Sequence, residues 1–327
     1  MMTTPTIAIL EPGYAAYDTE TAVLGAAGAR IVTVEEDVDA VPALGDLNPR
    51  AILVRERTIG QAELTACPDL KVVVRYGVGT DNIDLEAARA RQIYVANVPD
   101  YGAENEVSDH ALSLYLAVQR RVASRDAEVR AGYWGLGQAA PIPSREDAVL
   151  GLIGCGRIGL VTLTKFRAFG FQRVLVHDPF MSPDAARAAD VELTDMDSLC
   201  ATADVISLHA PLTPDTHHIL NADRLARVKP TSIVINVSRG GLVDETALAT
   251  ALQDGRLFGA GIDVFEVEPI RPDNPLLGAP NTLLSDHNAW YSERSVALLQ
   301  RKAAQEIARV LSGQQPVNWV NRWPLDP

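Results

Sequence analysis

The stretch "VLGLIGCGRIGLVTLTKFRAFGFQRVLVHDP" spans residues 149–179 and places three glycines between an apolar strand pattern and a helical pattern. Gly154, Gly156 and Gly159 form a Gly-x-Gly-x-x-Gly motif, and Asp178 ends the next predicted strand, 19 residues after Gly159. In a dinucleotide-binding βαβ unit the first glycine permits a tight turn, and the second lets the backbone approach a pyrophosphate. The third lets the helix pack closely on the strand. The stretch therefore predicts a dinucleotide site.

Asp178 predicts which dinucleotide binds. Its carboxylate would accept hydrogen bonds from both hydroxyls of the adenosine ribose and would repel a 2′-phosphate. No Lys or Arg follows it directly, so we expect NAD rather than NADP. Arg157 and Ile158 would begin the helix whose N–H groups face the phosphates. A structural glycine turn beside a surface aspartate is the alternative interpretation.

The rest of the chain alternates short apolar runs with segments of helical length, which predicts parallel sheets covered by helices. The predicted strands lie at 6–10, 29–34, 51–55, 71–76, 93–97, 147–154, 173–178, 204–210, 232–238, 259–265 and 281–287. A long connecting helix is predicted over 103–132, where apolar residues recur at helical spacing, and a final helix over 292–313. The fold class is α/β, and a length of 327 residues fits two domains.

Composition excludes several kinds of partner. The formal net charge of −13 argues against nucleic acid and anionic membranes, although a small anionic substrate depends only on local charge. No apolar run reaches the roughly 18 residues that a membrane helix needs, and the first residues lack the pattern of a signal peptide. The three cysteines are too widely spaced for a disulfide framework or a zinc site. We expect a soluble, cytoplasmic protein in a reducing compartment.

Motifs beyond residue 200 carry a family resemblance. The segments "INVSRGGLVDETAL" (235–248), "GIDVFEVEP" (261–269) and "SDHNAWYSE" (285–293) resemble those of the D-isomer-specific 2-hydroxyacid dehydrogenases. The segments "VVRYGVGTDNID" (73–84) and "NVPDYGAENEVSDHAL" (97–112) are also similar to signatures of that family. Within it, "LHAPLTPDTHHILN" (208–221) and "HNAWYSE" (287–293) most resemble the branch that contains the C-terminal binding proteins.

The resemblance implies a domain organisation and an activity. A flavodoxin-like substrate domain would comprise residues 1–99 and 292–327, and a Rossmann-type, doubly wound NAD-binding domain residues 100–291. The reaction would move a hydride between NAD(H) and a small D-2-hydroxy acid or 2-keto acid. The family also implies a homodimer, with the 103–132 helix and the following arm at the interface.

The family pattern implies Arg239, Glu268 and His287 as the catalytic residues. Oxidising a 2-hydroxy acid removes a proton from its hydroxyl, which suits histidine as the general base. Glu268 would orient the imidazole and stabilise its cation. The guanidinium of Arg239 has the fork geometry that binds a substrate carboxylate.

The same resemblance implies further binding residues. Asp263 would hold the nicotinamide carboxamide, and four more residues would line the cofactor site, namely Pro211, Thr216, Val237 and Ser238. The backbone of a substrate-domain loop would bind the substrate carboxylate, its residues being Tyr76, Gly77, Val78 and Gly79.

Some features depart from the family or leave alternatives open. Asp286 stands where many members have a proline before the histidine, and Trp290 follows where small residues are common. No ligand set accompanies His217 and His218, so no metal is expected, and Cys155 is interpreted as a small filler. Two alternative functions are an NADH-responsive, corepressor-like binding protein and a dehydrogenase of another reduced acid such as phosphite.

Overall fold

A computed structural model describes residues 4–135 and 141–324 of the chain. The chain divides into two compact units, and each is described by itself. The first unit comprises Met1–Gly102 and Ser292–Pro327, and the second comprises Ala103–Tyr291. Within the described ranges, no helix combines the length and the apolar character that crossing a membrane requires.

The first unit contains a five-stranded parallel sheet in the order β2-β1-β3-β4-β5. The strands are β1 (Thr6–Leu10), β2 (Arg30–Val34), β3 (Ala51–Val54), β4 (Val72–Arg75) and β5 (Tyr94–Ala96). The helices are α1 (Asp18–Ala26), α2 (Ala40–Leu47), α3 (Gln61–Ala66), α4 (Leu85–Ala90) and α12 (Glu293–Leu311). This strand order is the flavodoxin-like one, as the sequence predicted.

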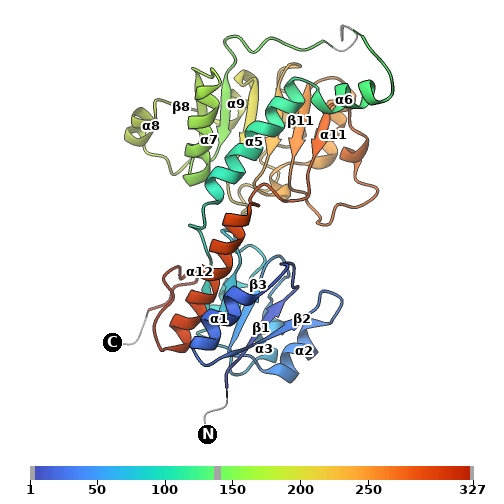
Figure 1. Cartoon of the computed structure of the whole chain (residues 1–327). Helices are drawn as coiled ribbons and strands as arrows, with labels where there is room; N and C mark the ends of the chain where they lie inside the picture. Colours follow the sequence, from blue (N-terminus) through green and yellow to red (C-terminus); the bar gives the residue numbers. More distant parts are fainter. Residues whose placement is uncertain (1–3, 136–140, 325–327) are drawn as a thin grey trace. The chain divides into compact units, whose positions relative to one another are not determined.

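The final helix α12 returns to the first unit and lies beside α1 (Figure 1). Gln300 of α12 donates from Nε2 to the Ala16 carbonyl (2.8 Å) and to Oε2 of Glu20 (3.2 Å). The other oxygen of the buried Glu20 accepts a hydrogen bond from the Tyr76 hydroxyl at 2.7 Å. A buried polar group must find such partners, so these bonds fix α12 to a specific place on the unit.

The second unit contains a seven-stranded parallel sheet in the order β12-β11-β10-β9-β6-β7-β8. The strands are β6 (Leu150–Ile153), β7 (Val174–His177), β8 (Glu192–Leu193), β9 (Val205–Leu208), β10 (Ile233–Asn236), β11 (Gly259–Ile262) and β12 (Thr282–Leu284). The helices are α5 (Ala103–Gln119), α6 (Val122–Arg130), α7 (Arg157–Ala168), α8 (Pro183–Ala189), α9 (Met196–Thr202), α10 (Ala222–Leu225), α11 (Glu245–Gln253) and the 3₁₀ turns η1 (Gly240–Leu242) and η2 (Pro275–Gly278). From the central strand β6 the sheet continues through β7 to β8 at one edge. From β9, the other neighbour of β6, it continues through β10 and β11 to β12 at the opposite edge, which is the doubly wound Rossmann order.

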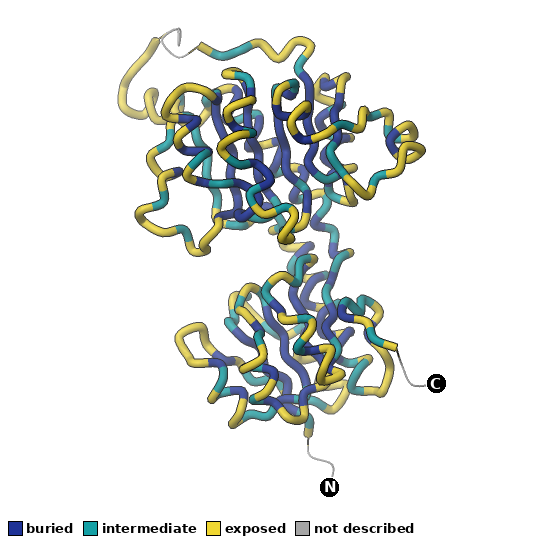
Figure 2. The backbone as a smooth tube through the Cα atoms, turned by 180° about the vertical axis from the view of Figure 1, so that it is seen from behind, coloured by how far each residue is buried: buried dark blue, intermediate teal, exposed yellow. Residues whose placement is uncertain are grey.

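In both units the central strands are buried and the outer turns of the helices are exposed (Figure 2). Strands β3, β4, β6, β9 and β10 are buried along their whole length, which explains their nearly continuous apolar sequences. The α/β class with two parallel sheets is confirmed. Because every strand is parallel to its neighbour, the carboxyl ends of the strands in each unit share one edge of the sheet.

The prediction of one helix over 103–132 is wrong. The structure has two helices, α5 and α6, with Arg121 between them in the left-handed conformation at φ 53°. The Arg121 guanidinium lies over the Phe258 ring, 4.7 Å from its centroid. Many residues of α5 are buried against the sheet, whereas none of α6 is. The apolar stripe that predicted the helix therefore ends with α5.

Candidate active site

The glycine motif is shaped by close contacts at its first and third positions. Gly154 has φ 84°, and a Cβ placed on it would lie 2.8 Å from the Ala210 nitrogen. A Cβ on Gly159 would lie 2.7 Å from the Gly154 carbonyl oxygen. A Cβ on Gly156 would meet no atom within 4 Å. The space in front of Gly156 is what a pyrophosphate approaching the backbone would use.

The groups beside this space suit the two ends of a dinucleotide. Helix α7 starts at Arg157, directly after Gly156, and a helix N-terminus favours phosphate. Asp178 follows β7, and its carboxylate accepts hydrogen bonds from the Cys155 nitrogen (2.8 Å) and the Phe180 nitrogen (2.9 Å). The bond from Cys155 fastens the aspartate to the glycine loop. The residues present therefore fit a bound dinucleotide.

Cys155 is a buried member of this loop. Burial, and then the Asp178 charge, raises the pKa of its thiol to about 11. The thiol stays protonated at neutral pH, and a protonated thiol is a poor nucleophile. This environment agrees with a filler role.

The other residues predicted to bind the cofactor lie in the loops that follow β9 and β10. Thr216 donates from Oγ1 to the Pro211 carbonyl at 2.7 Å, and Ser238 donates from Oγ to the Ala210 carbonyl at 2.6 Å. Val237, directly after β10, is buried. Because β6, β9 and β10 are adjacent, both loops lie at the same edge of the sheet as the glycine motif.

Glu268 and His287 form the central contact of the site. Nδ1 of His287 lies 2.6 Å from Oε2 of Glu268, and the Phe265 nitrogen donates to Oε1 at 2.9 Å. Burial raises the pKa of the Glu268 carboxyl, but the His287 hydrogen bond and charge, the Phe265 N–H and the charge of Arg239 lower it by more. The pKa lies below its usual value, so Glu268 is a carboxylate at neutral pH. Because the charge of Arg239 acts on the pKa of Glu268, and Glu268 contacts His287, the three predicted residues interact with one another through Glu268.

Arg239 is positioned by the turn that follows β10. The Asn236 side chain donates to the Arg239 carbonyl at 2.9 Å, and Nη1 of Arg239 donates to the Ser238 carbonyl at 2.8 Å. A Cβ on the next residue, Gly240, would lie 1.9 Å from the carbonyl carbon of Phe265. Only glycine permits this approach of the β10 loop to the β11 loop, which carries Glu268.

Asp263 holds the loop that presents His287, a role that the sequence did not predict. Its carboxylate is fully buried and accepts hydrogen bonds from the Ser285 hydroxyl (2.6 Å) and the nitrogens of Asn288 (3.1 Å) and Ala289 (3.0 Å). The His287 nitrogen donates to the Asp263 carbonyl at 2.7 Å. His287 itself adopts φ 56°, a left-handed conformation that is costly for a residue with a side chain. The bonds to Asp263 hold that conformation.

His110 and Ser285 are two more members of the site that sequence reasoning missed. Nε2 of His110 on α5 lies 2.8 Å from the Ser285 hydroxyl and 3.5 Å from Oδ1 of Asp263. The only signal in the sequence was their place in the segments at 97–112 and 285–293, which resemble family signatures.

The two departures from the family pattern have defined contacts. Asp286 is exposed, and its Oδ1 accepts a hydrogen bond from the Asn288 side chain at 2.7 Å. The carboxylate that faces Nδ1 of His287 is thus that of Glu268. Trp290 donates from its indole N–H to the His287 carbonyl at 3.0 Å and so braces the same loop.

In the first unit, the loop Tyr76–Gly79 directly follows β4. Gly77 has φ 129°, and its carbonyl accepts a hydrogen bond from the Val98 nitrogen at 2.9 Å. The Asn97 side chain donates to the Val78 carbonyl at 2.6 Å. The Tyr76 nitrogen donates to the Val54 carbonyl at 2.8 Å, so hydrogen bonds hold the loop through one N–H and two carbonyls, and Val78 is exposed. That arrangement suits a loop whose N–H groups after Tyr76 bind an anion.

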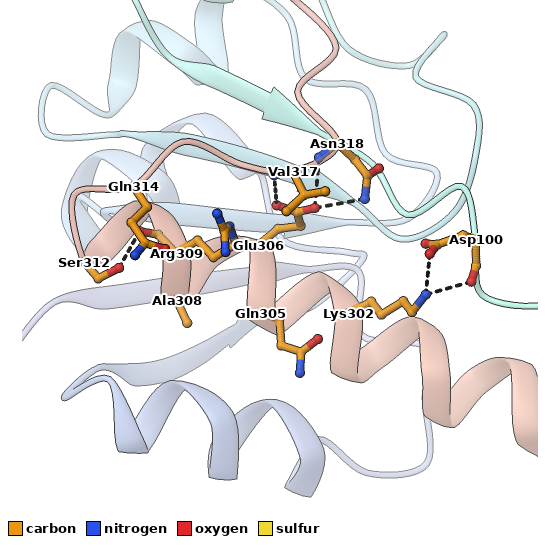
Figure 3. A pocket seen from close by; sticks show the side chains of 10 residues that line it. All are labelled: Asp100, Lys302, Gln305, Glu306, Ala308, Arg309, Ser312, Gln314, Val317 and Asn318. Carbon is orange, nitrogen blue, oxygen red and sulfur yellow. Dashed lines mark hydrogen bonds and ion pairs between the residues drawn. The ribbon is translucent and has the colours of Figure 1, made fainter.

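A hollow in the first unit lies between α12 and the segment that follows it (Figure 3). The charged side chains of Glu306 and Lys302 in this hollow are paired with other groups of the first unit. Glu306 accepts hydrogen bonds from the Val317 nitrogen (2.8 Å) and the Asn318 nitrogen (3.0 Å), and Lys302 pairs with Asp100 at 2.5 Å. The contacts of Glu306 hold the C-terminal segment against α12, and the Lys302 pair holds α12 to Asp100, which follows β5. Among the described residues, no group of three or more His, Cys, Asp or Glu is arranged to hold a metal ion.

Comparisons with known proteins show which family has this site. Residues 112–289 match the family model described as D-isomer specific 2-hydroxyacid dehydrogenase, NAD binding domain. The chain is 38% identical over 260 residues to a glyoxylate reductase of Korarchaeum cryptofilum, covering 79% of this chain and 78% of the relative. It is 40% identical over 274 residues to a D-3-phosphoglycerate dehydrogenase of Mycobacterium leprae, covering 83% of this chain but 51% of that relative.

A solved structure is similar over nearly the whole chain. It is the NADPH-dependent glyoxylate/hydroxypyruvate reductase of Sinorhizobium meliloti in complex with NADP and malonate. The TM-score is 0.84 at 30% identity, and the match covers 97% of each chain. All three relatives are named as enzymes, so they do not support the predicted relationship to the branch that contains the C-terminal binding proteins.

The open space at Gly156 generates a prediction. Gly156→Val places a side chain where a pyrophosphate would lie, and the backbone at φ −73° accepts any L-residue. We expect the melting temperature to change by less than about 2 °C, since no protein atom is displaced, while NADH affinity falls at least about 10-fold. Fluorescence titration with NADH and a thermal melt measure the two quantities.

Gly25→Val is the matched control, because a Cβ there also meets no atom within 4 Å and the site lies in the first unit. It should leave NADH affinity unchanged. Undiminished NADH binding by Gly156→Val would contradict the assignment of this loop.

Proposed function

The chain belongs to the D-isomer-specific 2-hydroxyacid dehydrogenases, and from that premise we propose that Arg239, Glu268 and His287 carry out its chemistry. The protein is an NAD(P)-dependent oxidoreductase that interconverts a 2-hydroxy acid and a 2-keto acid. The 2.6 Å contact between His287 and Glu268 is the observation that carries the proposed roles.

In the direction of reduction, His287 is the general acid. With Nδ1 held by Glu268, Nε2 is the ring nitrogen left to give a proton to the ketone oxygen. The carboxylate of Glu268 stabilises the imidazolium before that transfer, and Arg239 pairs with the substrate carboxylate. A dinucleotide held by the glycine motif and Asp178 would supply the hydride for C2. In oxidation the imidazole takes the proton back.

We further propose that the cofactor is NAD rather than NADP. The carboxylate of Asp178 follows β7 and is fastened to the glycine loop by the Cys155 nitrogen. A carboxylate there accepts hydrogen bonds from ribose hydroxyls and repels a 2′-phosphate. The Sinorhizobium meliloti relative is NADPH-dependent by name, so the family model alone does not decide the choice.

The carboxamide role of Asp263, the substrate-binding role of the 76–79 loop and the assembly of the chain are also proposals. We propose a homodimer whose interface includes α6 and the residues that follow it. None of the nine residues of α6 is buried, and Val122, Val129, Tyr133 and Trp134 expose apolar side chains. Exposed apolar side chains this close together along the chain favour an interface.

The cofactor proposal predicts a preference for NADH over NADPH. Asp178→Ser removes the repelling charge and keeps a hydrogen-bonding group, so the ratio of kcat/KM for NADH to that for NADPH should fall by at least about 10-fold. Steady-state assays with a 2-keto acid and each reduced cofactor give the ratio. Equal efficiency with both cofactors in the unmodified protein would refute the proposal.

The catalytic proposal predicts distinct effects of three substitutions. His287→Ala should lower kcat by roughly 10²–10⁴-fold and leave NADH affinity nearly intact. Arg239→Lys should be severely damaging, because lysine keeps the charge but loses the fork. Glu268→Gln removes the charge that stabilises the imidazolium, so the pH range in which reduction is fast should end at a lower pH.

Asp286→Asn is the control, since Asp286 bonds to Asn288 and should leave the pH profile in place. The measurement is the pH dependence of 2-keto-acid reduction by each variant. Full turnover by His287→Ala, or an unshifted profile in Glu268→Gln, would remove that residue from the mechanism.

The dimer proposal predicts that Trp134→Asp weakens self-association. Trp134 is 91% exposed in the single chain, and a charge in an apolar interface is costly. Sedimentation analysis should show a dimer for the unmodified protein and a larger monomer fraction for the variant. Leu277→Asp changes an exposed apolar residue elsewhere and should leave the dimer intact. A monomeric unmodified protein would disprove the assembly.

A further inference from the structure

The carboxyl edge of the first sheet carries two arginines beside the loop proposed to bind the substrate carboxylate. Strands β1, β3 and β4 are neighbours in this sheet, and Glu11, Arg55 and Tyr76 directly follow them. Arg75 is the last residue of β4. Two guanidinium groups next to an anion-binding loop would ordinarily favour a substrate with more than one negative charge.

Arg75 lies directly against the loop. It is buried, and a Cβ on Gly77 would come within 1.7 Å of its Nη1. Its Nε donates to the Arg55 carbonyl at 3.1 Å, and its Nη2 pairs with Oε1 of Glu56 at 2.7 Å. The positive charge under the loop is therefore already paired with the carboxylate of Glu56, whose side chain is 44% exposed.

Arg55 has a carboxylate neighbour of its own. Its Nε lies 3.9 Å from Oε1 of Glu11, and the same oxygen accepts a hydrogen bond from the Glu56 nitrogen. The backbone of Glu11 is in the left-handed conformation, at φ 48°. The cluster of Glu11, Arg55, Glu56 and Arg75 thus holds two positive and two negative charges.

Arg57, the remaining cation of this segment, is directed elsewhere. Its guanidinium donates to the carbonyls of Glu35 (3.4 Å) and Val38 (2.6 Å), in the loop that follows β2. The paired cluster therefore offers no surplus positive charge to a second anionic group of a substrate, and the half-exposed Glu56 would repel one.

We propose that Glu56, supported by Glu11, makes the protein select 2-keto acids with a single negative charge over those with a second carboxylate or a phosphate. This inference rests on the proposed function, because it assigns the substrate class of the same site. It separates the two activities named among the relatives, since glyoxylate carries one charge and a phosphoglycerate carries more.

The test compares substrates that differ in one anionic group. The kcat/KM for NADH-dependent reduction is measured with hydroxypyruvate against 3-phosphohydroxypyruvate, and with 2-oxobutanoate against oxaloacetate. We expect the singly charged member of each pair to be favoured by at least about 10-fold. Glu56→Gln should reduce that preference by about 5- to 10-fold, the order expected when one charge is removed from a partly exposed site.

Salt and a control variant separate charge from structure. Raising ionic strength from 20 to 500 mM should weaken the preference of the unmodified protein more than that of Glu56→Gln, because salt screens the repulsion. A purely structural effect on the loop would raise KM for both members of a pair and leave their ratio unchanged. Glu86→Gln, an exposed position paired with Arg89 on α4, removes the same charge and should leave the preference intact. Glu11→Gln is the second variant and should act in the same direction as Glu56→Gln.

The outcomes distinguish this inference from the proposed function. Turnover of 2-keto acids without a charge preference, or with a preference that Glu56→Gln and Glu11→Gln both leave unchanged, overturns the selection by these carboxylates and leaves the dehydrogenase intact. Absence of turnover with every 2-keto acid overturns both.

Discussion

The buried carboxylate of Asp263 is the group on which the geometry of the site depends. Burying a charge costs free energy unless hydrogen bonds replace the water it loses. Here the Ser285 hydroxyl and the backbone nitrogens of Asn288 and Ala289 supply those bonds. Each of them comes from the loop that contains His287. The requirement to satisfy one buried acid at the end of β11 therefore orders the loop after β12 and fixes where the imidazole stands.

The hydrogen-bonded pair of His287 and Glu268 is built on that support. The carboxylate of Glu268 is held at one oxygen by the Phe265 nitrogen, and the other oxygen faces Nδ1 of His287. Arg239 lies near this pair because Gly240 permits the loop after β10 to pack on the backbone of Phe265. Three loops from the neighbouring strands β10, β11 and β12 thus converge, and parallel pairing is what brings their carboxyl ends to one edge.

Local pairing matters more than net charge for the anions that this protein handles. The chain carries a formal charge of −13, yet its proposed substrate and cofactor are both anionic. The cations that could attract such anions have acidic neighbours: Glu268 lies near Arg239, and Glu56 pairs with Arg75. Electrostatic energy falls with distance and is screened by salt, so these neighbours outweigh distant surface carboxylates. Charged groups that lie next to a bound ligand can therefore discriminate between two ligands, whereas the net charge of the chain cannot.

The sequence by itself determined the α/β class, the strands and the glycine motif, because buried parallel strands and a phosphate-binding turn each require a local pattern of residues. It also pointed to Arg239, Glu268 and His287 through their motifs. The tertiary structure decided what depends on contacts between distant segments. The break at Arg121 follows from where burial of α5 ends. The anchoring by Asp263 and the pairing of Arg75 with Glu56 each join the ends of successive strands, which lie side by side only in the folded sheet. Local patterns carry no record of such contacts, since the partners meet only when the sheets form.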